Sequence, residues 1–548
     1  MENLLSRFLP RQDFDTYEDF KKNFTVTVPE NFNFGYDVVD AWAELEPAKP
    51  ALVWCDDHGG EAGFTFGDIS RESNRAANFL RSVGIGKGNA VMLLLRRRHE
   101  YWTIAAALHK LGAILIPATL QLTKKDIAYR VNAANAKALI CVSDDYTLTQ
   151  TDGAEFGHPV QKIVVAGTRE GWLSYDTEVA KHSVSLDRVP NLSTDTMLMY
   201  FTSGTTGMPK MVVHSFAHPL GHIVTAKYWQ QVQDGKLHMS VSDSGWAKFG
   251  WGKIYGQWIC GAVIFAYDMD KYVPSNLLSK IEKYKLTTFC APPTMYRFML
   301  QEDLTKYDLS SLKHCCNAGE PLNPEVFRNF EKLTGLKLCE GFGQSESTVL
   351  VANMEWFEPR PGSMGKPVPL YDIELIDENG KPCAAGVEGE LVILNHGGRP
   401  AGLFLEYRGD PEHNRAIEGS VYHTGDVAWR DDDGYYWFVG RNDDVIKCSG
   451  YRIGPFEVES ALLEHESVVE CAVTAVPDPI RGQVVKATVV LKKELTGSPE
   501  LVKELQNHVK KLTAPYKYPR VVEFTEELPK TVSGKIKRAQ IRREDEKA

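Results

Sequence analysis

The sequence predicts an α/β fold, with a large N-terminal domain of mostly parallel α/β subdomains plus a small β subdomain, followed by a small mobile α+β C-terminal domain. The first observation is that short, fully apolar segments alternate with helical patterns between residues 36 and 190. Such alternation is typical of parallel sheets that are covered by helices. The second is a run of short strands and Gly/Pro turns at residues 371–437. The third is length, because 548 residues exceed what one hydrophobic core normally holds.

The expected elements follow in chain order. Residues 64–66 lead into a helix for which Ser70 is the expected N-cap, since a serine side chain can accept from the first free N–H groups. Residues 101–111 and 294–302 have helical patterns. Apolar runs of four to six residues predict buried strands at 90–95, 113–117, 138–142, 162–166, 262–265 and 287–291.

A domain boundary is expected at residue 440, which gives a large domain at residues 1–440 and a small mobile domain at residues 441–548. The polar turn at residues 440–444 lies between two short strands and predicts a hinge. Beyond it, Pro455 is expected to open a helix, because proline fits the first helical turn. A second helix is expected at residues 499–512, with strands between the two helices.

Composition indicates a soluble cytoplasmic protein. The net charge is −10 without a strongly basic block, which argues against nucleic acid as a partner. The ten cysteines include no C-x-x-C pair, a distribution typical of reduced thiols rather than of disulfides or a zinc site. Residues 1–10 lack the apolar core of a signal peptide, and the apolar run at 105–120 is too short and polar to span a membrane. Homo-oligomer formation stays open.

The most distinctive segment predicts a phosphate-binding loop. Its nine residues lie between two apolar segments and are Thr202, Ser203, Gly204, Thr205, Thr206, Gly207, Met208, Pro209 and Lys210. Glycines let several backbone N–H groups point at one anion, and the hydroxyls and the lysine add donors. The segment is not a Walker A loop, because Pro209 replaces the second glycine and Met211 the Ser/Thr. Pro209 and the apolar run behind it favour strand–loop–strand.

Four further segments contain side chains that could bind a ligand or take part in catalysis. They are residues 317–322 (NAGEPL), 340–347 (EGFGQSES), 422–426 (YHTGD) with 433–441, and 529–538 (PKTVSGKIKR). Together with 202–210, in this order and at these separations, they resemble the adenylate-forming superfamily of acyl-CoA synthetases, luciferases and peptide-synthetase adenylation domains. Residues 242–246 (SDSGW), 449–455 (SGYRIGP) and 477–487 (PDPIRGQVVKA) are most similar to medium-chain acyl-CoA synthetases. The resemblance covers nearly the whole chain.

The resemblance implies an ATP-dependent acyl-CoA synthetase. Such an enzyme activates a carboxylic acid as acyl-AMP with release of pyrophosphate, and then transfers the acyl group to CoA as a thioester. ATP, Mg²⁺ and CoA are therefore the implied cofactors and co-substrates. The first step brings a carboxylate against a triphosphate, so charge neutralisation and in-line positioning carry most of the catalysis.

The resemblance also assigns the phosphate site. Residues Thr202 to Lys210 would bind the β- and γ-phosphates, and Ser345 would contact the α-phosphate. Glu346 would hold Mg²⁺, for which a hard oxygen ligand beside phosphate is suitable. Lys535 would bridge the substrate carboxylate and the α-phosphate, where charge builds up as the bond forms. Lys535, Glu346 and Lys210 are the implied catalytic residues.

Adenine and ribose are assigned to the large domain as well. Phe342 would offer a flat face for adenine, and Asp426 would accept the ribose hydroxyls. Arg441 would reach the ribose or the phosphates. The opposite side of adenine would be the turn of Gly319, Glu320 and Pro321.

Three of these residues also have ordinary structural interpretations. Phe342 could be a core aromatic, Asp426 could shape a turn, and Lys535 could belong to a solvated basic tail. The complete set of motifs favours the site over these alternatives.

The second half-reaction needs access for CoA, which the segment of Lys535 would obstruct. The resemblance implies that the small domain rotates about a hinge at Asp443 and then presents another face. Arg452 would contact phosphates of either nucleotide. The implied CoA residues are Lys447, Ser449, Gly450, Tyr451 and Arg481.

The implied acyl pocket consists of Trp246, Lys248, Phe249, Trp251 and Gly343. Acetate-activating relatives carry a tryptophan where this chain has Gly343, so the resemblance implies an open pocket floor. It favours a medium-chain, branched or aromatic acid over acetate. Lys248 is unexpected in an apolar region; it either meets a polar group of the substrate or pairs with an acidic neighbour.

Two other functions are compatible with parts of this pattern. One is a stand-alone adenylation enzyme that loads a carrier protein. The other is a nucleotide-binding sensor without catalysis, against which Glu346 and Lys535 argue, because binding alone requires neither.

Overall fold

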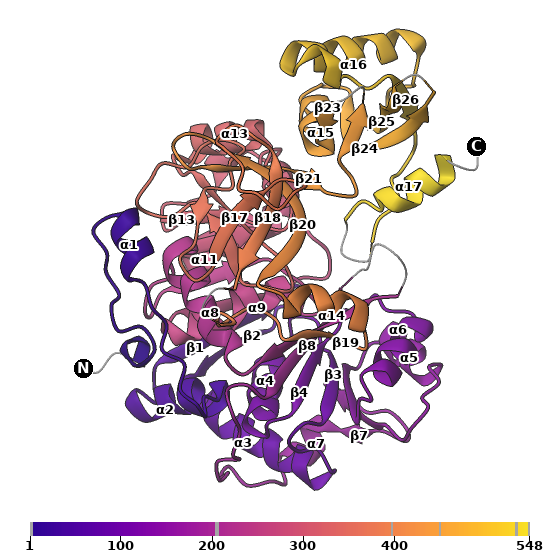
Figure 1. Cartoon of the computed structure of the whole chain (residues 1–548). Coiled ribbons are helices and arrows are strands. Elements are labelled where there is room, and N and C mark those ends of the chain that lie inside the picture. The colour runs from indigo at the N-terminus through magenta and orange to yellow at the C-terminus, as the bar shows by residue number, and fades with distance from the viewer. Residues whose placement is uncertain are drawn as a thin grey trace.

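The structure, a computed structural model, describes residues 4–202, 208–395, 398–448, 451–479, 481–531 and 535–545, without the side chains of 415–418. Figure 1 shows a large body built from the first four fifths of the chain and a smaller C-terminal part beside it. The predicted α/β class is confirmed. None of the helices in these ranges is long and apolar enough to cross a bilayer.

One large sheet contains, within the described residues, eight strands in the order β19-β9-β8-β4-β3-β5-β6-β7. The strands from β8 to β7 in this order are parallel, whereas β9 runs antiparallel to both of its neighbours, β8 and β19. The strands are β3 (Ala90–Leu94), β4 (Ile114–Pro117), β5 (Ala138–Val142), β6 (Gln161–Val165), β7 (Leu173–Ser174), β8 (Thr196–Thr202), β9 (Lys210–Ser215) and β19 (Glu406–Arg408). The pair β8 and β9 confirms the predicted strand–loop–strand arrangement.

The other large sheet has, again within the described residues, nine strands in the order β16-β15-β14-β13-β12-β10-β11-β1-β2. Its central part from β14 to β1 is parallel. The strands are β1 (Pro50–Asp56), β2 (Glu61–Thr65), β10 (Leu237–Ser240), β11 (Val263–Asp268), β12 (Thr288–Ala291), β13 (His314–Asn317), β14 (Leu338–Gly343), β15 (Val349–Ala352) and β16 (Lys366–Pro367).

Helices lie between the two sheets and outside them. The central core joins the inner faces of both sheets to α3 (Phe66–Ser82), α4 (Glu100–Lys110), α8 (His218–Ile223) and α10 (Tyr255–Ile259). The outer face of the eight-stranded sheet packs against α5 (Lys124–Ala133) and α6 (Asp145–Asp152). The outer face of the nine-stranded sheet packs against α11 (Pro274–Tyr284), α12 (Pro293–Met299) and α13 (Pro324–Thr334). Both sheets are thus covered on both faces, as their continuous apolar strands predict.

One expected helix start is wrong. Helix α3 begins at Phe66 with Thr65 as its N-cap, because Thr65 and Asp68 form a reciprocal capping box. Ser70 lies inside the helix and donates its hydroxyl to Asp40 at 2.6 Å. A threonine with an acidic residue three positions later gave the stronger start signal.

The small β subdomain is an antiparallel sheet in the order β17-β18-β20-β21. Its strands are β17 (Asp372–Ile376), β18 (Gly389–Leu394), β20 (Val421–Arg430) and β21 (Tyr436–Arg441), and α14 (Pro411–Glu418) precedes β20. Strand β19, which the sequence pattern did not reveal, leaves this subdomain and pairs with β9 of the eight-stranded sheet. That pairing brings residues 406–408 to the strand that begins with Lys210.

The chain from Ile446 onward forms its own sheet and core. Strands β22 (Ile446–Cys448), β23 (Tyr451–Ile453), β24 (Val468–Asp478), β25 (Gly482–Leu491) and β26 (Val521–Phe524) pack against α15 (Pro455–Leu463) and α16 (Pro499–Leu512). The final helix, α17 (Arg538–Asp545), contacts β24. Helices opened by Pro455 and Pro499 are both as predicted, while the boundary at residue 440 stays a prediction.

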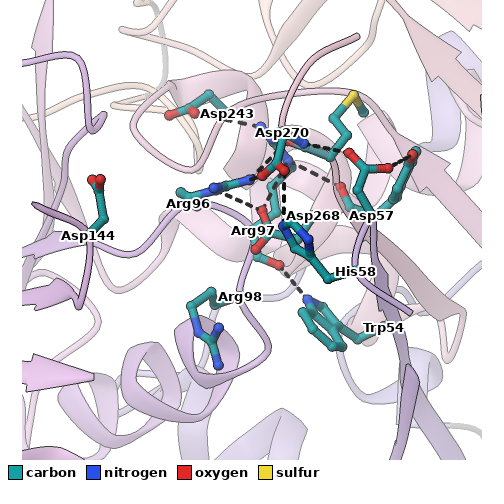
Figure 2. Close-up of polar contacts among 12 residues, drawn as sticks. Trp54, Asp57, His58, Arg96, Arg97, Arg98, Asp144, Asp243, Asp268 and Asp270 are labelled. Atoms are coloured by element: carbon teal, nitrogen blue, oxygen red, sulfur yellow. Dashed lines mark hydrogen bonds and ion pairs between the residues drawn. The ribbon is translucent and has the colours of Figure 1, made fainter. Parts of the chain in front are cut away.

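An arginine-rich turn joins the two large sheets (Figure 2). Arg96, which follows β3, donates to Asp268 at the end of β11 at 3.1 Å and to Asp270 at 2.8 Å. Arg97 donates to the carbonyl of Tyr267 at 3.1 Å and lies 3.7 Å from the Asp243 carboxylate. Asp243 accepts from the N–H of Gly245 and so orders the turn before Trp246. The arginine-rich turn therefore fixes the segment 242–246 relative to both sheets.

All ten cysteines lie in the described part of the chain, where they are buried and free. This agrees with the expectation of reduced thiols. Burial raises the pKa of most of them, as for Cys141, whose pKa rises to about 12.

Candidate active site between the two large sheets

The phosphate end of the candidate site is formed by β9, β19 and the turn after β14. Lys210, Val212 and His214 lie on one face of β9, and Tyr407 pairs with Val212 on the neighbouring strand. The Nζ of Lys210 is 5.0 Å from the centre of the Tyr407 ring. The Tyr407 hydroxyl donates to Oε1 of Glu346 at 2.8 Å. The structure therefore brings Lys210 and Glu346 to one tyrosine, Lys210 over its ring and Glu346 at its hydroxyl.

The described part of the predicted phosphate loop consists of its two ends, Thr202 and residues 208–210. Thr202 ends β8 opposite Lys210, and Tyr129 donates its hydroxyl to the carbonyl of Pro209 at 3.0 Å. Ser203, Gly204, Thr205, Thr206 and Gly207 lie outside the described residues.

Asp426 is the centre of a second polar group. It is buried, accepts from Nε2 of Gln344 at 2.5 Å and lies 3.5 Å from Arg441. Tyr422 donates its hydroxyl to Oε1 of Gln344 at 2.9 Å, which fixes the orientation of that amide. Burial raises the pKa of Asp426 to about 6, while Arg441 and Gln344 act in the opposite direction. A carboxylate with free acceptor capacity beside a cation is suited to bind vicinal hydroxyls.

Phe342 lies near the carboxyl end of β14, and the turn of Gly319, Glu320 and Pro321 follows the neighbouring parallel strand β13. Phe342 is half-buried and its ring centre lies 6.0 Å from that of Phe438. Gly319 has φ +99°, a conformation that favours glycine. Because the carboxyl ends of adjacent parallel strands share one sheet edge, these residues lie where an α/β sheet usually binds ligands.

A buried glutamate supports this turn. Glu340 accepts from the N–H of Leu322 at 3.2 Å, directly behind the turn. Burial raises the pKa of Glu340 to about 7. Its neighbour Glu320 accepts from the hydroxyl of Thr294 at 2.6 Å.

Lys535 bonds to Thr531, four residues earlier. Its backbone N–H donates to Oγ1 of Thr531 at 3.1 Å, and its carbonyl accepts from the N–H of Thr531 at 2.7 Å. The Lys535 side chain is exposed. Its positive charge partly offsets the rise that burial causes in the pKa of Asp426, and it adds to the fall that burial causes in the pKa of Lys248.

Lys248 lies in the first turn of α9 (Ala247–Lys253), which has Trp246 as its N-cap. Its ammonium donates to the carbonyl of Ala318 at 2.6 Å. Burial lowers the pKa of Lys248, and Lys535 acts in the same direction. Its described hydrogen bond thus goes to a backbone carbonyl at the start of the predicted adenine turn.

The remaining predicted acyl-pocket residues lie close together but differ in exposure. Phe249 is buried against Tyr101, with ring centres 4.6 Å apart. A Cβ on Gly343 would lie 2.3 Å from Cη2 of Trp251 and 2.5 Å from the carbonyl oxygen of Thr348. The indole of Trp251 thus fills the space beside Gly343, so the missing side chain does not by itself open the pocket floor.

The described residues among those predicted to bind CoA lie on or next to the strands of the C-terminal sheet. Lys447 is exposed on β22, and Tyr451 on β23 is exposed and stacks on Tyr516, with ring centres 4.1 Å apart. Arg481 precedes Gly482, which pairs with Cys448 of β22, so all three positions share one end of the sheet. Ser449 and Gly450 lie outside the described residues.

Arg452 and Arg441, which lie near the predicted hinge, are both close to carboxylates of the protein. Arg452 donates to Glu378 at 3.4 Å and lies 3.9 Å from Glu388, both in the small β subdomain. Nε of Arg441 lies 3.8 Å from the Asp443 carboxylate, in the turn between β21 and β22. Arg452 is therefore not among the residues that the structure gathers around Asp426 and Glu346.

The donor set around Glu346 suits Mg²⁺ that is shared with a nucleotide. In the described residues, no group of three or more His, Cys, Asp or Glu side chains could hold a metal ion alone. Mg²⁺ usually takes one or two carboxylates and completes its shell with phosphates and water. Glu346 accepts one hydrogen bond on Oε1 and supplies such a carboxylate.

Several residues of the site escaped the sequence reasoning. Tyr407 lies in a stretch without a recognisable motif, whereas Gln344 and Tyr422 belong to the motif segments 340–347 and 422–426 but had no assigned role. His214, whose Nε2 lies 2.8 Å from the carbonyl oxygen of Ser345, belongs to the apolar run after Lys210 and had no assigned role either. The sequence did contain one signal for His214. It lies four residues after Lys210 on the same expected strand, and residues at every second position of a strand share a face.

Comparison with known proteins agrees with this geometry. The AMP-binding enzyme family matches residues 39–401, and the AMP-binding enzyme C-terminal domain matches residues 457–535. The chain belongs to the AMP-binding enzyme family. Acyl-coenzyme A synthetase ACSM3 of Mus musculus, a mitochondrial protein, is 42% identical over 97% of this chain and 94% of its own length. Acyl-coenzyme A synthetase ACSM4 of Rattus norvegicus, also mitochondrial, is 44% identical over 94% and 91%.

Solved structures share the fold of this family member over nearly the whole chain. The anthranilate CoA ligase AuaEII in complex with anthranoyl-AMP has a TM-score of 0.86 and 30% identity, with 95% of this chain and 98% of that chain covered. A Brucella canis acyl-CoA synthetase has a TM-score of 0.73 and 31% identity, with 97% and 99% covered.

The expectation of a cytoplasmic protein is contradicted. The ACSM3 and ACSM4 relatives are named as mitochondrial proteins. Scattered reduced cysteines and a moderate net charge do not distinguish the cytosol from another reducing compartment, which is why composition misled here.

Proposed function

We propose that this protein is an AMP-forming acyl-CoA synthetase that activates a carboxylic acid as acyl-AMP and transfers the acyl group to CoA. Membership of the family and the names of the relatives support the reaction class. The single observation that carries the proposal is the grouping of Lys210 and Glu346 around Tyr407, with the buried Asp426 hydrogen-bonded to Gln344 of the same turn. A cation and a carboxylate for the phosphates with Mg²⁺, beside a second carboxylate for the ribose, suit the binding of ATP for acyl-adenylate formation.

The residues divide the first half-reaction among them. Lys210 and the loop before it neutralise the β- and γ-phosphates, and Glu346 supplies the carboxylate that would hold Mg²⁺, which screens phosphate charge. Asp426 accepts the ribose hydroxyls, and the turn at Gly319 and Phe342 encloses adenine. These contacts hold the α-phosphate in line for attack by the substrate carboxylate, so most of the acceleration comes from positioning.

Lys535 completes the site when the charge develops. Its ammonium bridges the attacking carboxylate and the α-phosphate oxygen, and stabilises the negative charge that accumulates there as pyrophosphate leaves. The CoA thiolate then attacks the acyl carbonyl, and AMP leaves with the electron pair of the acyl–phosphate bond. We propose that rotation about Asp443 removes Lys535 before this step and brings Lys447, Tyr451 and Arg481 towards the acyl-adenylate.

The proposed substrate is a carboxylic acid larger than acetate. Trp246 and Trp251 supply apolar surface, and Lys248 supplies a polar contact near Ala318. A medium-chain, branched or aromatic acid suits this lining, and the reaction would belong to fatty acid metabolism. We also propose a mitochondrial location, on the names of the relatives.

ATP–pyrophosphate exchange with a panel of carboxylic acids tests the proposal. Wild-type protein should incorporate labelled pyrophosphate into ATP only when a suitable acid is present, and the acid with the highest kcat/KM identifies the substrate class. Product analysis with CoA and with a holo-carrier protein then identifies the acceptor. Absence of acid-dependent exchange across the panel would exclude an acyl-adenylate mechanism.

A further inference from the structure

Three histidines form a stack behind the candidate phosphate site, and no step of the proposed mechanism uses them. His214 lies on β9, and His218 and His222 lie one turn apart on α8. All three side chains are buried. The rings of His214 and His218 are 3.9 Å apart, and those of His218 and His222 are 4.7 Å apart.

The hydrogen bonds of the stack fix which nitrogens carry protons. The carbonyl oxygens of Ser345 and Gly402 can only accept, so Nε2 of His214 donates to Ser345 at 2.8 Å and Nδ1 of His218 donates to Gly402 at 3.3 Å. Nε2 of His218 is then an acceptor, to which Nε2 of His222 donates at 3.1 Å. Each ring is neutral in this arrangement.

Burial supports the neutral state. It lowers the pKa of His214 to about 4 and that of His222 to about 3, and it holds the pKa of His218 well below its usual range. The stack therefore keeps one hydrogen-bonding pattern at neutral pH.

The two carbonyls that the stack holds belong to the two segments that frame Glu346. Ser345 directly precedes Glu346, and the Glu346 carbonyl accepts from the N–H of Phe404 at 2.8 Å, two residues after Gly402. Gly402 has φ +93°, and a Cβ there would lie 2.8 Å from Cγ2 of Thr348. Neither segment can shift without breaking a buried hydrogen bond.

The same stack reaches the acyl pocket. The ring of His222 lies 6.1 Å from that of Trp251, which packs against Gly343. One group of buried side chains thus contacts both the Ser345 and Gly402 carbonyls and, through His222, the predicted acyl-pocket residue Trp251.

We propose that His214 is a positioning residue for acyl-adenylate formation. Through its hydrogen bond to the Ser345 carbonyl, backed by His218 and His222, it holds Ser345 in place for the α-phosphate and the adjacent Glu346 in place for Mg²⁺. The inference rests on the proposed function and adds a residue to the adenylation site. It acts through Ser345 and does not touch the nucleotide. Its loss should therefore weaken the use of MgATP rather than the use of the acid or of CoA.

The test compares three variants of His214 in the full-length protein. His214→Phe keeps a flat ring but removes the donor, and His214→Gln keeps an N–H near the position of Nε2. His214→Asn keeps a polar group that is too short to reach the Ser345 carbonyl. Loss of one buried hydrogen bond corresponds to roughly tenfold in rate or affinity.

The expected result is a roughly tenfold rise in the KM for MgATP in ATP–pyrophosphate exchange for His214→Phe and for His214→Asn. The KM for the acid, and thioester formation from supplied acyl-adenylate, should stay within about twofold of wild type. His214→Gln should recover most of the loss. A matched control is His314→Phe. His314 is also buried, and its Nε2 lies 2.7 Å from the carbonyl oxygen of Trp229, which is not one of the predicted site residues. This control should lower thermal stability without changing the KM for MgATP selectively.

Three results would overturn the inference: an unchanged KM for MgATP in folded His214→Phe and His214→Asn, equal loss of both half-reactions, or no recovery in His214→Gln. If His214→Phe does not fold, His214→Asn and His214→Gln still decide the matter. Failure of the proposed function looks different, since the wild-type protein itself would then show no acid-dependent exchange.

Discussion

The Tyr407 hydroxyl donates to the Glu346 carboxylate at 2.8 Å, although 61 residues separate the two along the chain. Burial and the charge of Glu346 raise the pKa of Tyr407 above its usual range, so the hydroxyl stays protonated and can only donate through its proton. This contact orients one oxygen of the carboxylate and leaves the other for a cation. It also links β19, a strand that comes from the small β subdomain, to the turn after β14 that contains Glu346.

Removal of this hydroxyl should loosen the carboxylate. Tyr407→Phe is expected to raise the KM for MgATP roughly three- to tenfold, because one buried hydrogen bond to a charged group is lost. Steady-state exchange at varied Mg²⁺ measures the effect. Tyr17→Phe is the control, since the Tyr17 hydroxyl donates to the carbonyl of Pro367 at 2.8 Å in the rim of the large domain. Equal KM values for the two variants would remove Tyr407 from the site.

Lys535 should act in one half-reaction only. Lys535→Ala is expected to slow acyl-adenylate formation by about 10²–10³, the range for losing one preorganised charge donor. Thioester formation from supplied acyl-adenylate should persist at nearly the wild-type rate. Lys537→Ala, two residues away and exposed, is the control for loss of a positive charge in this segment. Equal loss of both half-reactions in Lys535→Ala would contradict the role.

The pKa of Asp426 predicts a pH dependence. Its folded-state pKa of about 6 lies above the usual value of 3.8, because burial disfavours the charged form. Above pH 6 the carboxylate is ionised and can accept the ribose hydroxyls; below pH 6 it is protonated. The KM for ATP should therefore rise as pH falls through about 6, and in Asp426→Asn it should be high and flat over this range.

In the nucleotide-free protein, the contribution of Asp426 to the free energy of unfolding should decrease as pH rises. A raised folded-state pKa contributes stability that is complete below pH 4 and is lost as pH rises through 6. The melting temperature of Asp426→Asn minus that of wild type should therefore be larger at pH 7.5 than at pH 5. A difference that does not change with pH would show that the carboxylate does not titrate in this window.

The contact between Gly343 and Trp251 predicts a coupled pair. Gly343→Ala would place a Cβ 2.3 Å from the indole and should destabilise the fold by about 1–3 kcal/mol, the usual cost of overpacking. In the double variant Gly343→Ala, Trp251→Phe, the smaller ring should restore part of this loss and shift the preferred acid. Thermal unfolding and the acid panel measure both effects. Full additivity of the two substitutions would show that the residues do not share this space.

Much of the architecture was predictable from local pattern. Buried parallel strands are apolar along their whole length, and Pro455 and Pro499 open helices because proline fits the first turn; both signals are confined to a few adjacent residues. The strand pair around the phosphate loop was predictable for the same reason. The cap of α3 was missed because two hydroxyl residues competed for it and only the one with Asp68 three positions later forms the capping box.

The chain's order of motifs determined the family and predicted Lys210, Glu346, Asp426 and Lys535 as site residues, because each motif is a short contiguous segment that can be recognised without coordinates. Tertiary structure alone decided that Tyr407 orients Glu346, that Trp251 occupies the space beside Gly343, that Arg452 pairs with Glu378 and Glu388, and that His214 holds Ser345. The physical reason is that these contacts join segments tens to hundreds of residues apart. Which of many similar side chains meet across such separations depends on strand register and helix packing, and neither is encoded within one local segment.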